Sequence, residues 1–321
     1  MDLIYTNAKR QDIGVLMDYE MDLAFGQDEN SFECTIAQTA HCCEAGSYLY
    51  IDGTEYGGII DAIQSKSDTK EVIYHGRTWQ GILNSKVLEP DSGADYLVCS
   101  GDANTVIATL LSRVGLSGLF SAAAETSGLT IKSYKMDRYI PAYDGIRKML
   151  ASIGGKLLFT VHDGGVVLSA VPVVDYTQNE EFDSDLVEFD VKKTFNTVNH
   201  LICLGKGELA DRTVIHLYAD AEGNISTTKT QTGLDEITAI YDYSSVESAE
   251  ELEAQGRAKL KELWEPASLK IDFDDDSDSY DVGDIVGAVD NVTKISVAAE
   301  IVKKIITIKN GKTTISYKVG E

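Results

Sequence analysis

Short runs that alternate between apolar and polar residues, separated by tight-turn dipeptides, most limit what this chain can fold into. Asn310-Gly311 lies between the runs KKIITIK and KTTISYKV, and this dipeptide is the strongest short-range signal of a β-hairpin. Asp-Gly pairs at 52–53 and 163–164 separate further runs of the same kind. Because alternation places apolar side chains on one face of a strand, antiparallel sheet is predicted as the main component.

Three segments have the period of a helix instead. Residues 102–114, 142–153 and 249–264 each place apolar residues three and four positions apart, which forms a stripe along one face. The last segment is preceded by Ser248, and Glu251 follows three residues later, which is the spacing of a capping box. The sequence therefore predicts three helices among many strands.

The order of these elements predicts a mainly β chain with an α+β insertion. At 321 residues the chain has the length of roughly two domains, with a third possible. An acidic, polar stretch at 176–185 is typical of a linker. We expect the N-terminal part of a first β domain at 1–95, an inserted α/β domain at 96–185, the returning part of the first β domain at 186–247, and a helix with a second β domain at 248–321.

Charge and composition exclude several classes of protein. The chain carries 52 Asp and Glu but 28 Lys and Arg, a net charge of −24, so it lacks the basic character needed to grip nucleic acid or an anionic membrane. The N-terminus does not resemble a signal peptide, and no run of about 18 apolar residues occurs, so no membrane insertion is expected. The cysteines are odd in number and form no CxxC pair, which predicts reduced, buried thiols in a protein made in a cytosol: Cys34, Cys42, Cys43, Cys99 and Cys203.

Two motifs resemble ligand sites without meeting their requirements. GKGELA at 205–210 fits the dinucleotide pattern G-x-G-x-x-A, but the segment after it alternates like a strand, so a hairpin turn is predicted. The run at 272–284 has Asp at every second position from 272 to 278, yet it lacks Gly at position 6 and Glu at position 12 of a calcium-binding loop, whether counted from 272 or from 274. A solvated acidic loop is favoured there, with calcium binding as the lesser alternative.

Histidine and cysteine side chains offer no recognisable catalytic or metal-binding pattern. His41 adjoins Cys42 and Cys43, but neighbours on a strand point to opposite faces, so a structural pair is favoured over a Cys–His dyad. The other histidines lie in or beside predicted strands without the spacing of a metal-binding helix: His75, His162, His200 and His216. We therefore assign no catalytic, cofactor-binding or metal-ligating residue, and expect a protein that is not an enzyme.

The 16 tyrosines leave two interpretations open. Tyrosine combines an apolar ring with a polar tip, which suits subunit contacts. It is also favoured in exposed strands of any sheet. The sequence does not decide between these interpretations.

Three parts of the sequence carry a family resemblance. They are EVIYHGRTWQGILNSKVLEP (71–90) with SGDANTVIATLL (100–111), NHLICLGKGELADRTVIHLYAD (199–220), and YDVGDIVGAVD (280–290) with KNGKTTISYKVG (309–320). In this order they resemble the tail-associated hub proteins of long-tailed bacteriophages, in particular the Gp37-like tail proteins of siphoviruses. That group is similar to the baseplate hub family of contractile tails. The likeness spans almost the whole chain and contains no catalytic signature.

The resemblance implies both a fold and a function. Proteins of this family carry two tube-like antiparallel β-barrel domains and a small α/β domain, and three copies close into a ring. The ring joins a sixfold tail tube to a threefold tip, between a distal tail or tube protein and a spike, fibre or tip protein. The resemblance thus implies a homotrimeric structural protein of a phage or prophage tail or baseplate, assembled in the bacterial host cytoplasm. DNA would pass through its channel without specific binding, and no cofactor is implied.

The acidity and the length of the chain bear on this expectation. Three copies would carry 3 × −24 = −72 charges, and a lumen lined by carboxylates would repel the DNA backbone. The plainer alternative is that acidity only aids solubility. Because the chain ends at Glu321, directly after the last predicted strand, we expect no C-terminal hydrolase domain. Two other functions stay open: a tail-tip module that binds host-surface carbohydrate or protein and, less favoured, a cell-wall hydrolase.

Overall fold

A computed structural model describes the fold of residues 2–178, 181–183, 189–194, 197–246, 248–264, 267–274 and 279–320. Strands predominate in this part of the chain, with four α-helices between them, so the protein is mainly β as predicted. It divides into two compact units: unit 1 comprises Met1–Phe189, Lys270–Val292 and Ala298–Glu321, and unit 2 comprises Asp190–Leu269 and Thr293–Val297. Within the described ranges, no helix is both long and apolar enough to cross a membrane.

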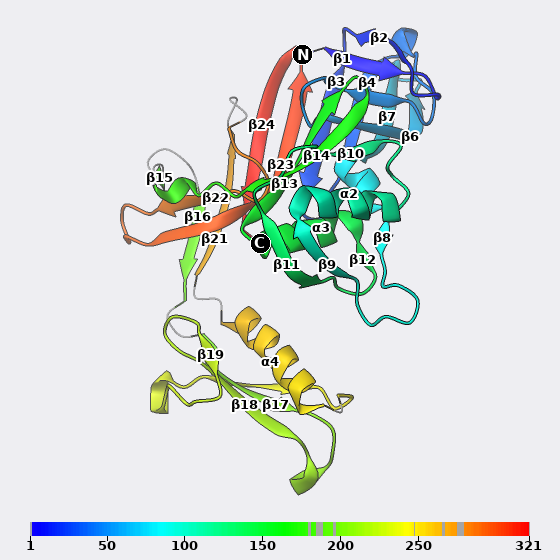
Figure 1. Cartoon of the computed structure of the whole chain (residues 1–321). Helices are drawn as coiled ribbons and strands as arrows, with labels where there is room; N and C mark the ends of the chain where they lie inside the picture. The colour runs from blue at the N-terminus through cyan, green and yellow to red at the C-terminus, as the bar shows by residue number, and fades with distance from the viewer. Residues whose placement is uncertain are drawn as a thin grey trace. The chain divides into compact units, whose positions relative to one another are not determined.

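One large sheet runs through unit 1 (Figure 1). Its order is β16-β21-β24-β23-β3-β4-β7-β6-β5-β1-β2, and β22 pairs with both β23 and β15. Among the described residues this path ends at β2 and β16, so no closed barrel forms within one copy. The strands are β1 (Leu3–Thr6), β2 (Asp12–Leu16), β3 (Glu20–Gly26), β4 (Ser31–Ala37), β5 (Tyr48–Tyr50), β6 (Gly57–Lys66), β7 (Glu71–Thr78), β15 (Glu181–Asp183), β16 (Phe189–Lys193), β21 (Ala267–Asp274), β22 (Ile285–Val289), β23 (Ser296–Lys309) and β24 (Lys312–Val319).

All three turn dipeptides connect antiparallel strands, as predicted. Two-residue turns join β23 to β24 at 310–311 and β13 (Gly155–His162) to β14 (Gly165–Pro172) at 163–164. The four residues of these turns have φ between 50° and 73°, which the tightest hairpin turn requires. The pair at 52–53 connects β5 to β6, but it lies within a longer loop.

The C-terminal strands belong to the same sheet as the N-terminal ones. β23 pairs antiparallel with β3. The contact is close at Gly26, where φ is +130° and a Cβ would lie 2.2 Å from the carbonyl oxygen of Val302. We expected the segments 1–95 and 248–321 to form separate β domains. Their strands instead share one sheet, because alternation predicts which residues form strands but not which strands pair.

The three predicted helices are present with slightly shifted ends. They are α2 (Ala103–Arg113), α3 (Ala142–Ala151) and α4 (Ala249–Leu263). The Ser248 side chain accepts a hydrogen bond from the backbone N–H of Glu251, which is one half of the predicted capping box. A fourth helix, α1 (Trp79–Asn84), was not predicted. It has only six residues, five of them buried, so it shows no amphipathic stripe.

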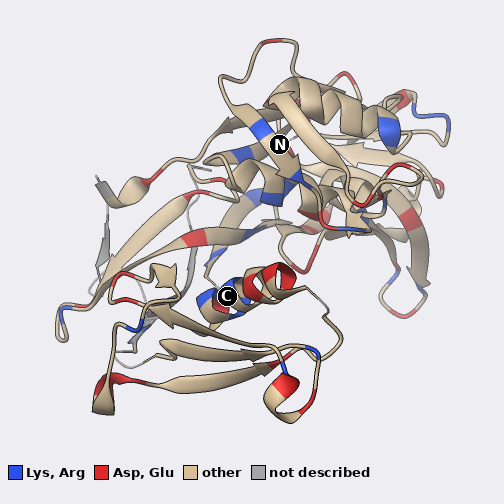
Figure 2. Cartoon of the chain, turned by 60° about the horizontal axis from the view of Figure 1, so that its bottom comes forward, with Lys and Arg blue, Asp and Glu red and all other residues tan. Residues whose placement is uncertain are grey.

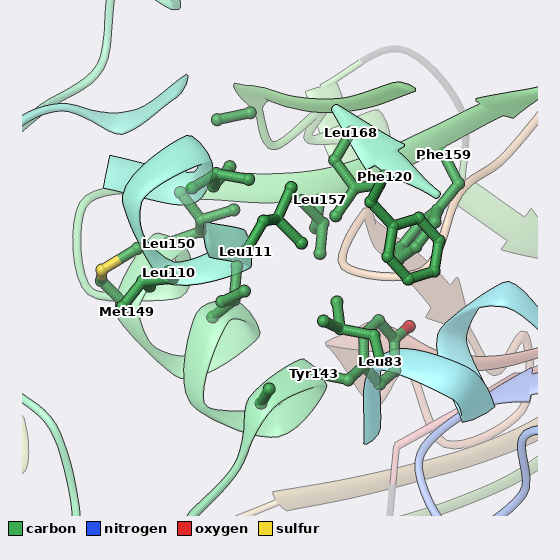
Figure 3. Close-up of a cluster of buried hydrophobic side chains, with 14 of the residues drawn as sticks. Leu83, Leu110, Leu111, Phe120, Tyr143, Met149, Leu150, Leu157, Phe159 and Leu168 are labelled. Atoms are coloured by element: carbon green, nitrogen blue, oxygen red, sulfur yellow. The ribbon is translucent and has the colours of Figure 1, made fainter. Parts of the chain in front are cut away.

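A hydrophobic core joins α2 and α3 to the β13–β14 hairpin (Figure 3). Phe159 of the hairpin lies edge-on to Phe120 and to Tyr143 of α3. These helices and this hairpin lie within the range 96–185, where we expected an inserted α/β domain, and they belong to the same compact unit as the large sheet. The short strands around this core are β8 (Val87–Leu88), β9 (Val98–Asp102), β10 (Phe120–Ala122), β11 (Thr130–Lys135) and β12 (Ile140–Pro141).

The predicted linker at 176–185 is only partly described. It begins with a 3-10 turn (Tyr176–Gln178) and includes β15, which pairs in parallel with β22. Its remaining residues lie outside the described ranges. Strand β15, in the described part of this segment, is thus a strand of the large sheet.

Unit 2 contains a four-stranded sheet in the order β19-β18-β17-β20. Its strands are β17 (His200–Leu204), β18 (Val214–Ala219), β19 (Ile225–Ser226) and β20 (Thr238–Asp242). α4 covers one face of this sheet and buries Leu201, Cys203, Leu217, Leu252 and Leu260. The helix lies so close to β17 that a Cβ at Gly256 would be 2.4 Å from the Cys203 sulfur. Unit 2 is therefore a two-layer structure, and no described α-helix covers the other face of its sheet, which we call the uncovered face.

Candidate functional site

Strand β2 forms an edge of the large sheet and carries exposed apolar side chains. Among the described strands it pairs only with β1. Ile13 and Val15 occupy alternate positions of β2 and are 57% and 41% exposed, and Met17, directly after the strand, is 83% exposed. An edge strand presents unpaired backbone groups that can pair with another chain, and natural sheets usually blunt such edges with charge. An apolar edge of this kind is a candidate assembly surface.

The uncovered face of the unit 2 sheet is a second candidate surface. Strands β17 and β18 contain no Lys, Arg, Asp or Glu, although the whole chain has 80 such residues among 321 (28 and 52). Figure 2 shows the strands of this sheet largely in tan, whereas the helix that covers it is coloured red and blue. On the uncovered face Val214 is 45% exposed and Ile240 is 69% exposed. Exposed apolar side chains beside strands without charged residues make this face a candidate interaction surface.

A hydrogen-bonded histidine pair lies on this same face. His200 Nδ1 is 2.8 Å from Glu236 Oε1, and His200 Nε2 is 2.8 Å from His216 Nδ1. Lys229 Nζ lies 2.6 Å from the other carboxylate oxygen of Glu236. Because the carboxylate accepts from His200 Nδ1–H, His200 Nε2 is left to accept from His216 Nδ1–H in the neutral pair. With a proton on His200 Nε2, the contact would persist only if His216 Nδ1 changed from donor to acceptor.

The surroundings of His200 keep it neutral. Burial, the largest cause, lowers the pKa of His200, and the nearby His216 and Lys229 lower it further. Glu236 opposes them and raises the pKa, but the net direction is downward. The Tyr218 ring stacks on His200 at 4.4 Å between centroids, and the Thr238 hydroxyl lies 3.0 Å from its Nδ1. His200 therefore favours its neutral form near neutral pH.

A buried ion network lies in unit 1. Lys156 is 5% exposed, and its Nζ lies 2.7 Å from both carboxylate oxygens of the fully buried Asp284. The same ammonium group lies 2.6 Å from Asp281. A second buried lysine, Lys304, lies 3.0 Å from Glu55. Charges this deep are stable only when paired, so these groups are structural.

The His41, Cys42 and Cys43 cluster does not form a nucleophilic dyad. These residues follow a 3-10 turn (Gln38–Ala40) and do not lie in a strand, so our reason for separating them was wrong. The Tyr74 hydroxyl accepts from the backbone N–H groups of Cys42 and Cys43 and lies 2.9 Å from His41 Nδ1. Burial raises the pKa of the Cys43 thiol, which keeps it protonated and unreactive.

Four of the five cysteines and the dinucleotide-like motif are as the sequence analysis predicted. All five thiols are free and four of them are buried, whereas Cys42 is exposed against expectation. The segment 205–210 follows β17 and leads through a 3-10 turn (Leu209–Asp211) to β18, so it is the predicted hairpin connection. Both ends of this connection are held by the hydrogen bond from Gly205 N–H to the carbonyl of Thr213.

No metal site is evident in the described part of the acidic run at 272–284. Residues 276 and 278 lie outside the described ranges, and the Asp residues at 272 and 274 belong to β21. Across the described ranges, no three His, Cys, Asp or Glu side chains are arranged to hold a metal ion. Asp284, at the end of the run, is instead paired with Lys156.

Many tyrosines lie in the core, which neither interpretation of them anticipated. The fully buried ones include Tyr48, Tyr50, Tyr56, Tyr74 and Tyr317. The histidine pair was missed as well. His200 and His216 share a face because Ile202, two residues after His200, lies opposite His216 in the antiparallel pairing. That relation depends on the length of the 205–213 connection, which a search for helical spacing does not examine.

Comparison with solved structures gives full-length matches to phage tail proteins. The chain is similar to a tail protein from Neisseria meningitidis (14% identity, TM-score 0.52, covering 100% of this chain and 96% of that one). It is similar to prophage tail protein gp18 from Listeria monocytogenes (16%, TM-score 0.55, 99% and 94%). It is also similar to the 43 kDa tail protein of prophage MuSo2 from Shewanella oneidensis (10%, TM-score 0.57, 99% and 98%). The chain is thus mainly β, as expected, and its fold is similar to that of these tail proteins.

Comparison of the sequence gives no further match. No family model matches the chain, and no curated protein sequence matches it. At 10–16% identity the structural likeness concerns the fold alone. The role of the molecule therefore has to be argued from its surfaces.

Proposed function

We propose that this chain is a structural protein of a phage or prophage tail and acts as the tail or baseplate hub. The observation that carries the proposal is the fold, which matches three tail proteins over almost their full length. The apolar edge strand β2 supports it, because a ring that continues its sheet from one copy to the next would cover this edge. The working form is a homotrimer, and the tube-like barrels arise from sheets that continue around the ring.

The proposed mechanism is symmetry matching and channel formation. A ring of three copies joins the sixfold tail tube on one side to a threefold spike, fibre or tip protein on the other. Its formal charge of 3 × −24 = −72 favours passage of DNA without binding, since like charge repels the phosphate backbone. The protein would be assembled in the host cytoplasm and carried in the virion tail, with no catalytic role.

A second candidate function is a tail-tip module that binds a host-surface carbohydrate or protein. The face of the unit 2 sheet opposite α4 favours it, because the exposed apolar side chains of Val214 and Ile240 offer a contact surface there. Binding of the isolated protein to a glycan array would support this candidate over the hub. A cell-wall hydrolase is less favoured, since the described His and Cys side chains form no activated nucleophile.

The hub proposal is tested by the mass in solution, measured by size-exclusion chromatography with light scattering. The expected mass of the trimer is 104.7 kDa (3 × 34.9 kDa). A double variant, Ile13→Lys with Val15→Lys, should abolish the trimer, whereas Val98→Lys, at a similarly exposed position (54%), should not. A trimer that survives the edge substitutions contradicts the role of β2. A particle with a filled axis in electron micrographs contradicts the channel.

A further inference from the structure

A cavity of about 260 Å³ lies in unit 1 and is lined by cations but by no carboxylate. Arg10 from the β1–β2 turn, Arg77 from β7 and Lys86 after α1 line it. The segment 115–119 after α2 closes another side. In a chain with 52 acidic and 28 basic residues, a cavity lining with three cations and no Asp or Glu is unexpected. Such a lining points to a negatively charged ligand.

Two of these cations have no carboxylate partner among the residues that the structure describes. Arg77 is neutralised, since its guanidinium forms two hydrogen bonds with Asp61, of 2.7 and 2.8 Å. Neither Arg10 nor Lys86 forms an ion pair with any described residue. Both are exposed, so they can reorient toward a ligand. Two positive charges are therefore available at one cavity.

The rest of the lining adds orientation and an apolar floor. The Arg10 guanidinium lies over the Tyr48 ring, 5.2 Å from its centroid, and this cation–π contact keeps the group at the cavity. Within the described chain, the backbone N–H of Gly118 donates to no acceptor, and a Cβ at this glycine would meet open space. Ile59 and Ile82 contribute apolar surface. The cavity lining thus combines hydrogen-bond donors with hydrocarbon.

We propose that this cavity binds a phosphate monoester. Two unpaired cations balance a phosphate group, which carries a charge of about −1.5 to −2 near pH 7, whereas a carboxylate would leave one cation unpaired. Arginine and lysine are the side chains that most often hold phosphate, through charge-assisted hydrogen bonds. The volume suits a compact ester, because pockets for drug-sized ligands begin at about 300 Å³. The apolar floor favours an ester with a small hydrocarbon group over inorganic phosphate.

Titration calorimetry of the full chain at constant ionic strength tests the proposal, with phenyl phosphate, inorganic phosphate and acetate as probes. Phenyl phosphate should bind saturably and most tightly, inorganic phosphate more weakly, and acetate least. Arg10→Gln and Lys86→Gln should each weaken phenyl phosphate binding about tenfold, the effect of losing one charge-assisted hydrogen bond. Lys9→Gln is the matched control. It removes the same charge from the same turn at a residue that does not line the cavity, and affinity should stay within about twofold.

Three results would overturn the site. They are no saturable binding of phenyl phosphate to the unmodified protein, equal binding by the Arg10→Gln and Lys86→Gln variants, and an equal loss in Lys9→Gln. The last would mean that general surface charge attracts the anion. Because the Arg10, Lys86 and Lys9 side chains are exposed, the three variants should unfold at the same temperature as the unmodified protein in the absence of ligand. A misfolded variant would show a different unfolding temperature, which distinguishes misfolding from loss of the site. The proposal does not depend on the hub role, since the cavity lies within one copy.

Discussion

Removing the charge of Asp284 should strongly destabilise unit 1. Its carboxylate accepts from Lys156 Nζ at 2.7 Å and from the backbone N–H groups of Val174 and Asp281, at 2.9 and 3.0 Å. In Asp284→Asn the amide keeps the shape but brings an NH₂ group toward these donors and leaves a buried ammonium less compensated. Breaking a buried ion pair by changing one partner costs about 3–5 kcal/mol. In a unit of this size, that loss lowers the unfolding temperature by roughly 6–20 °C.

The assay is thermal and urea-induced unfolding, followed by circular dichroism, with an exposed pair as control. Lys148 and Asp137 lie 3.0 Å apart with both side chains 60% exposed, so Asp137→Asn should cost less than about 1 kcal/mol. Combining Asp284→Asn with Lys156→Met should cost less than the sum of the two single changes, because the second removes the stranded charge. If Asp284→Asn costs no more than Asp137→Asn, or if the two changes add, the reasoning is refuted.

Two further predictions concern unit 2. The pKa of His200 in the folded chain is lowered from its ordinary value of 6.5. As the pH falls through that value, the unfolded chain therefore binds more protons than the folded chain, and unit 2 should lose stability from pH 7.5 to 5.5. Unfolding midpoints across this range should fall less steeply in His200→Gln, and a stability that rises on acidification would contradict this. Gly256→Ala should cost about 1–3 kcal/mol despite the better helix propensity of alanine, because the added Cβ meets Cys203 and Leu217 at 2.4 and 2.8 Å. Adding Cys203→Ala should recover part of this loss in urea unfolding, and an unaltered or raised midpoint in Gly256→Ala alone would refute the close packing.

The elements that the sequence predicted well are those governed by local chemistry. The Asn-Gly pair at 310–311 needs positive φ at two successive residues, and the observed angles of 53° and 73° meet that need without tertiary help. The helix α4 was recognisable because one face is apolar and Ser248 starts it. The helix α1 was not, since five of its six residues are buried and no polar face marks its period.

The polar clusters could not be predicted from the sequence, for a different reason. Lys156 and Asp284 are 128 residues apart, and nothing in either local pattern shows that they meet. The acidic run at 272–284 looked uniformly solvated, yet Asp284 is fully buried because a lysine from β13 reaches it. The cavity beside Arg10 likewise draws on four separated segments. Long-range juxtaposition of this kind is set by strand pairing, which alternation alone does not specify.

The path of the chain explains why the domain order was difficult to infer from the sequence. The chain leaves unit 1 at Phe189 and returns at Lys270, within β16 and β21, which are neighbours in the large sheet. An insertion that departs and returns through adjacent strands leaves the rest of a sheet intact, so the two flanking parts can form one framework. Residues 190–269 therefore interrupt a sheet in sequence without dividing it in space. In the proposed hub, the sheet edge at β2 can therefore serve ring closure, and the residues on the uncovered face of unit 2 can change without altering that edge.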